Sequence, residues 1–86
     1  MKNRRINVRG TVTAITYPAQ GPNPALDVIV TVGEDDRLLL RFLGRRTMGC
    51  LEIGSLVRVR GALSDADGSP AVINPEFTVL PPERAR

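Results

Sequence analysis

The chain has 86 residues, which limits it to one domain with a modest core. It has no histidine, one cysteine and a net charge of +3, and most of its basic residues are arginine. These features exclude catalysis by histidine, metal ligation by histidine and an internal disulfide.

The chain shows neither a secretory signal nor an apolar run long enough to span a bilayer. We therefore expect a cytoplasmic protein that has no membrane partner. The serines have no obvious base beside them, and Cys50 is expected to be buried and unreactive. The sequence thus predicts a non-enzymatic protein with no cofactor and no metal.

The first predicted strand covers residues 5–17, where apolar and polar side chains alternate. Gly10 lies in its middle and lets the strand curl, because no side chain opposes the bend. Residues 17–24 contain three prolines and a glycine, which predict a loop.

The next two predicted strands, residues 25–33 and 37–43, form a hairpin. The acidic segment between them, Glu34–Asp36, is interpreted as a turn because it lacks the alternating oxygen ligands of a calcium loop. Residues 44–55 contain three glycines and are expected to be irregular or to form at most one helical turn.

The last two predicted strands are residues 56–63 and 71–80. A loop rich in Asp, Gly, Ser and Pro, residues 64–70, joins them, and Pro75 is expected to bend the final strand. Five short strands in a chain of this length predict an all-β fold, with an SH3-like barrel or an OB-fold barrel as the alternatives.

Two features favour the OB fold. The first strand is long and has a central glycine, so it can pair on both sides. The irregular segment falls between strands three and four, where the OB fold places a helix or plug. We therefore predict a five-stranded Greek-key OB-fold barrel. It is a single domain of residues 1–86 with a core of 6–80 and flexible ends at 1–4 and 81–86.

Several segments follow the order typical of bacterial OB-fold nucleic-acid-binding domains. They are Val8–Val12, Leu38–Phe42, Leu51–Gly54, Val57–Gly61 and Ile73–Phe77. The sequence resembles small stand-alone OB-fold proteins of high-GC Gram-positive bacteria, which also carry a segment like Phe42–Arg46. It is more distantly similar to the wedge domain of a branch-migrating helicase and to anticodon-binding domains of aminoacyl-tRNA synthetases. The resemblance implies nucleic-acid binding without naming a substrate.

The predicted binding residues are six arginines and one exposed aromatic residue. On an OB barrel, single strands lie on the outer face of strands two and three, flanked by loops. Arginines there pair with phosphates, and exposed aromatic rings stack on bases. We expect binding of single-stranded nucleic acid, with DNA favoured over RNA and little sequence preference. The predicted site residues are Tyr17, Arg37, Arg41, Arg45, Arg46, Arg58 and Arg60.

The same residues allow a second interpretation. The arginines are also compatible with an ordinary solvated surface, and strand four lies away from the expected binding face. Phe42 and Phe77 are assigned to the core, which leaves Tyr17 as the one predicted stacking residue.

An alternative function is contact with a protein partner or self-association. Four apolar residues have outward parity on three strands that are expected to be neighbours. A register error of one residue would remove part of this strip. The predicted strip is Ile15, Ile29, Leu39 and Leu43.

Overall fold

The computed structural model describes residues 4–47, 49–64 and 70–81. These residues form strands and loops and contain no helix, which confirms the predicted all-β class. The strands are β1 (Arg4–Thr16), β2 (Ala25–Val32), β3 (Asp36–Leu43), β4 (Leu56–Ser64), β5 (Ala71–Ile73) and β6 (Glu76–Val79).

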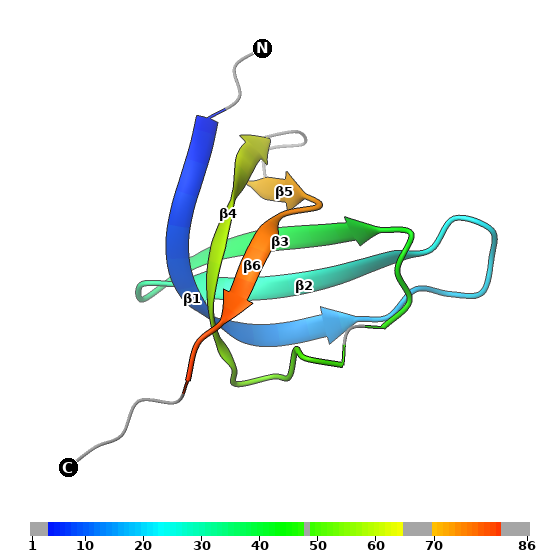
Figure 1. The fold of residues 1–86 in the computed structure, drawn as a ribbon, viewed down its shortest axis with the longest axis horizontal. Helices are drawn as coiled ribbons and strands as arrows, with labels where there is room; N and C mark the ends of the chain where they lie inside the picture. Colours follow the sequence, from blue (N-terminus) through cyan, green and yellow to red (C-terminus); the bar gives the residue numbers. More distant parts are fainter. Residues whose placement is uncertain (1–3, 48, 65–69, 82–86) are drawn as a thin grey trace.

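The strands form one sheet in which five strands close into a ring (Figure 1). The hydrogen-bonded order is β1-β2-β3-β5-β4, and a further pairing between β1 and β4 closes it. β3 and β5 run parallel, whereas the other pairs are antiparallel. β6 pairs with β4 beside the ring. The ring encloses the core and presents its outer faces to solvent.

β1 belongs to both sides of the ring because it bends at Gly10. Residues Arg4–Thr11 pair with β4, and Thr11–Thr16 pair with β2 (Figure 1). A Cβ atom on Gly10 would overlap the Val30 side chain and lie 2.6 Å from the Thr31 carbonyl oxygen. Only glycine fits this close approach, which agrees with the expectation that no side chain at residue 10 opposes the bend.

A β-bulge shifts the register of β1 between Val12 and Ala14. One extra residue reverses the alternation, so the rest of the strand turns its other side to the core. Ile15 therefore pairs with the fully buried Val28 and packs against the core. The prediction that Ile15 faces outward is wrong, and Ala14, opposite Ile29, takes its place on the outer face.

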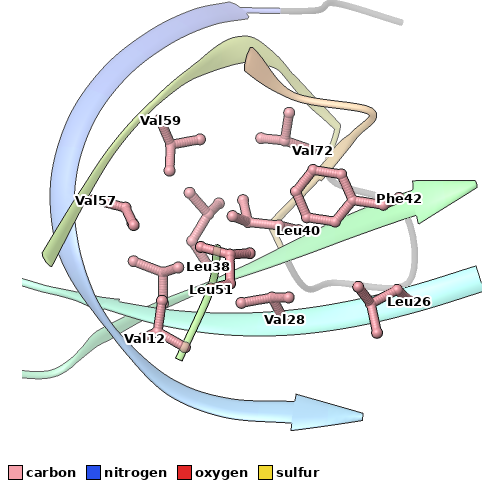
Figure 2. Packing of buried hydrophobic residues seen from close by; sticks show 11 residues of the cluster. Val12, Leu26, Val28, Leu38, Leu40, Phe42, Leu51, Val57, Val59 and Val72 are labelled. Carbon is pink, nitrogen blue, oxygen red and sulfur yellow. The ribbon is translucent and has the colours of Figure 1, made fainter. Parts of the chain in front are cut away.

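The core consists of aliphatic side chains from every side of the ring and one aromatic ring (Figure 2). Full burial of one such side chain contributes about 1.5–3 kcal/mol. Phe42 is 4% exposed, and its ring meets the half-buried Phe77 edge to face at 5.6 Å, as predicted for two core residues. The buried hydrophobic residues are Val12, Leu26, Val28, Val30, Leu38, Leu40, Phe42, Leu51, Val57, Val59 and Val72.

Other predictions need correction. The expected fifth strand divides at Asn74 and Pro75 into β5 and β6. Arg4, which the prediction put in the flexible N-terminus, begins β1. Cys50 is exposed, so its predicted burial is wrong.

The segment between β3 and β4 is irregular in its described residues, and a helical turn there is not supported. The remaining parts of the predicted flexible ends, 1–3 and 82–86, and residues 65–69 of the predicted loop lie outside the described residues. The described residues also contain no helix long and apolar enough to cross a membrane.

Candidate nucleic-acid interface

On the outer face of β2 and β3, Arg41 is held by a carboxylate of the same chain. Arg41 and Asp27 are cross-strand partners, and Nε and Nη2 of Arg41 donate to the two carboxylate oxygens at 2.9 and 3.1 Å. The hydrogen bond and then the charge of Asp27 raise the pKa of Arg41 above its ordinary value. A phosphate that approaches Arg41 must therefore compete with a bidentate partner already in place.

The other arginine of this face, Arg37, lies beside the acidic turn. It is exposed and pairs across the strands with Thr31. Glu34, Asp35 and Asp36 are exposed immediately before it. The β2–β3 hairpin thus carries more carboxylates than arginines, and it is a poor attractor of polyanions.

Arg46 connects the loop after β3 to the loop after β1 by hydrogen bonds. Its guanidinium donates to the carbonyl oxygens of Ala19, at 3.5 Å, and Gly21, at 2.6 Å. These contacts fix the loop that begins at Tyr17, whose side chain is 59% exposed as predicted. Arg46 therefore acts in this structure as a support for the loop, and the neighbouring Arg45 is exposed.

On the opposite side of the ring, the predicted residues Arg58 and Arg60 lie near arginines of β1. Arg9 of β1 and Arg58 of β4 are direct cross-strand partners, and both are exposed. Like charges directly opposite each other destabilise a sheet by a few tenths of a kcal/mol or more. An anion bound between the two guanidinium groups removes this repulsion. A hollow of about 520 Å³ borders Arg9 at the bend of β1.

The neighbouring cross-strand pairs of β1 and β4 extend this positive surface. Arg60 lies opposite Asn7, and its Nη2 atom is 3.2 Å from Oε1 of Glu76 on β6. Both side chains of that ion pair are more than half exposed, so solvent screens it and a ligand can displace it. Arg5 has the same parity as Arg9 and lies opposite Ala62. We name this surface the basic β1–β4 face and define it by Arg5, Arg9, Arg58 and Arg60.

The predicted site residues are therefore not assembled into one surface. Arg58 and Arg60 belong to the basic β1–β4 face, whereas Arg37 and Arg41 lie on the outer face of β2 and β3. The sequence contains one signal for the basic face, because Arg58 and Arg60 alternate with inward valines in β4, and Arg5 and Arg9 share the outward parity of β1. The register that places Arg9 against Arg58 depends on the β1–β4 pairing, which no local pattern reveals.

Within the described residues, no group of three or more His, Cys, Asp or Glu side chains is placed to hold a metal ion. No protein-family model matches the chain, and a search of curated proteins finds no significant match. The geometry and charge of the two outer faces are therefore the features that point to a function.

Proposed function

We propose that the chain is an OB-fold domain. Three features support this assignment: the closed strand order β1-β2-β3-β5-β4, the parallel pair β3–β5, and a long β1 that bends to pair on both sides. A small ring of this kind offers outer faces and loops for binding, so we propose a binding module without catalytic activity.

We further propose that this domain binds single-stranded nucleic acid on the basic β1–β4 face. The observation that carries the proposal is the direct opposition of Arg9 and Arg58 across two paired strands. The repulsion between these two arginines lowers the stability of the folded protein. A bound phosphate removes the repulsion and accepts a charge-assisted hydrogen bond from each guanidinium. Guanidinium groups suit this role because their planar fork matches a phosphate.

The spacing of the arginines fits a linear polyanion. Arg58 and Arg60 are two residues apart on one strand, which places them roughly 7 Å apart along its axis. A nucleic-acid backbone that crosses the face thus meets successive arginines. Contacts of this kind carry no base information, and we therefore propose weak sequence preference.

A fluorescent oligo-dT titration at two salt concentrations tests the proposal. If all four arginines of the face contact phosphates, the logarithm of the association constant falls with the logarithm of salt concentration at a slope of about −3. A slope near zero indicates that phosphates are not bound through these side chains. The absence of binding at low salt overturns the proposed function.

A second candidate function is contact with a protein through the opposite face. The bulge in β1 places an unbroken apolar row across four neighbouring strands, and Leu43 and Ile73 are exposed beside it. Such a row on a sheet face is typical of a protein contact. The row consists of Ala14, Ile29, Leu39 and Ala71.

Light scattering after size exclusion tests this candidate in its simplest form, self-association. A dimer that Leu39→Lys converts to a monomer supports the apolar row as the interface. A monomer at all concentrations excludes self-association and leaves only a different partner protein.

A further inference from the structure

A hollow of about 340 Å³ lies at the corner between β5 and β6, at the end of β3. The end of β3 forms one wall, and the Asn74–Pro75 corner forms another. The residues that line it are Phe42, Leu43, Arg45, Asn74, Pro75 and Phe77. We propose, on the basis of the nucleic-acid function proposed above, that this hollow binds one unstacked nucleobase of the strand.

The walls of the hollow combine polar groups with some apolar surface. Leu43 is 52% exposed, and Phe77 is half-buried, so both retain apolar surface that a base can cover. Phe42 closes the inner end with a ring that is nearly buried. Stacking of a base on aromatic and apolar side chains is tolerant of sequence, which agrees with the weak preference proposed for the strand.

Asn74 supplies a polar group at the edge of the hollow. Its backbone has a positive φ of 51°, and its N–H donates to the Arg41 carbonyl oxygen at 2.7 Å. Its Oδ1 atom accepts the Leu43 N–H at 2.8 Å. This contact identifies the oxygen and leaves Nδ2 with no partner among the described residues. Nδ2 is thus available to donate to an oxygen or ring nitrogen of a base.

Charge and position connect the hollow to the basic β1–β4 face. Arg45 lines the hollow and is exposed, so it can pair with the phosphate of the bound nucleotide. On the other side, Pro75 precedes Glu76, which lies opposite Arg60 across the β4–β6 pairing. Pro75 and Phe77, which line the hollow, are the chain neighbours of Glu76. A nucleic-acid strand that passes Arg60 can therefore continue into the hollow.

Two oligonucleotides of equal length separate phosphate binding from base binding. One is oligo-dT, and the other is the same backbone with abasic sites. The wild-type protein is expected to bind oligo-dT about 10-fold more tightly than the abasic strand, because one stacked base contributes about that much. Equal binding of the two strands overturns the base hollow and leaves the basic face intact. Failure of both strands to bind overturns the proposed function, and the hollow with it.

Two variants test whether the hollow is the source of the tighter binding of oligo-dT over the abasic strand. Leu43→Ala removes an exposed apolar wall, and Asn74→Asp keeps an acceptor for the Leu43 N–H while it removes the amide donor. Each is expected to reduce the ratio of the two affinities from about 10 to about 3 or less. Ile53→Ala is the matched control, since Ile53 is 67% exposed and does not line the hollow.

Thermal unfolding of each variant confirms that it is folded before the ratio is measured. If both variants keep the wild-type ratio, the base lies elsewhere and the proposal is wrong. If Ile53→Ala lowers the ratio as much as Leu43→Ala does, the hollow has no special role and the proposal is equally wrong.

Discussion

The two outer faces of the ring use arginine in opposite ways. On the β2–β3 side, Arg41 is paired with Asp27 and Arg37 follows an acidic turn. On the β1–β4 side, Arg9 opposes Arg58, and the only partner of Arg60 among the described residues is the exposed Glu76. The first face neutralises its own charge, whereas the second face keeps it available.

The contrast shows that the number of arginines on a strand does not locate a binding site. What matters is the residue opposite each arginine and the exposure of their contact. A bidentate, partly buried carboxylate occupies the guanidinium of Arg41, the exposed Glu76 holds Arg60 only weakly, and the opposition of Arg9 and Arg58 leaves both guanidinium groups in need of an anion. We therefore propose that polyanions bind on the β1–β4 side.

The largest expected effect comes from reversing the charge of the opposed pair. Arg9→Glu with Arg58→Glu is expected to weaken oligo-dT binding by about 100-fold or more at low salt, because two charge-assisted contacts become repulsive. Fluorescence anisotropy measures the affinity. Since a like-charged pair is retained, the fold is disturbed little.

The control for this test is on the other face. Arg37→Glu reverses one charge on an exposed strand residue, where the test variant reverses two, and it is expected to weaken binding about threefold or less through net charge alone. Equal losses from the two sets of substitutions contradict the assignment to the β1–β4 side.

The second test removes the bend that allows one strand to serve both faces. Gly10→Ala places a Cβ against Val30 and the Thr31 carbonyl oxygen, so it is expected to destabilise the fold by about 2 kcal/mol. The melting temperature then falls by roughly 10 °C. Gly49→Ala is the control, because its Cβ meets no atom within 4 Å. An unchanged melting temperature for Gly10→Ala means that the bend does not need glycine.

A third test asks whether Arg41 becomes a ligand when its partner is lost. Asp27→Asn frees the guanidinium and is expected to cost less than about 1 kcal/mol of stability, since the pair is partly exposed. The affinity for oligo-dT should rise by about threefold at most, from net charge alone. An increase of about 10-fold or more, measured by the same anisotropy titration, assigns the strand to the β2–β3 face.

The smallest expected effect concerns the cost of the opposed arginines. Arg58→Thr removes the repulsion and places a threonine opposite Thr78, so it is expected to stabilise the free protein by a few tenths of a kcal/mol. Denaturant unfolding measures this gain, while the affinity for oligo-dT falls. Arg60→Thr should not stabilise, because it loses the contact with Glu76. A loss of stability in Arg58→Thr indicates that the pair is not repulsive.

Much of the fold was accessible from alternation and from turn residues. The positions of β1 to β4 and the bend at Gly10 follow from local pattern, as does the burial of Phe42. The bulge after Val12 could not be predicted from local pattern. A one-residue insertion leaves the apolar pattern nearly unchanged, although it turns the Ile15 side chain from the outer face toward the core. The split of the last strand was visible only as the expected bend at Pro75.

The candidate site was less predictable than the fold. Arg58 and Arg60 were identified as basic residues, but their partners depend on long-range register. The sequence also could not predict two other contacts, the ion pair of Arg41 with Asp27 and the hydrogen bonds from Arg46 to the first loop. Each contact joins residues more than ten positions apart. A sequence pattern identifies which residues are exposed arginines, and only the fold determines which of them are already occupied.

The most direct test of the central claim is an NMR titration of the isotope-labelled protein with oligo-dT at low salt. We predict that the amide signals of Arg9, Arg58 and Arg60 shift with the added strand, while those of Arg37 and Leu39 remain near their free positions. Shifts confined to β2 and β3, or no shifts on either face, contradict it.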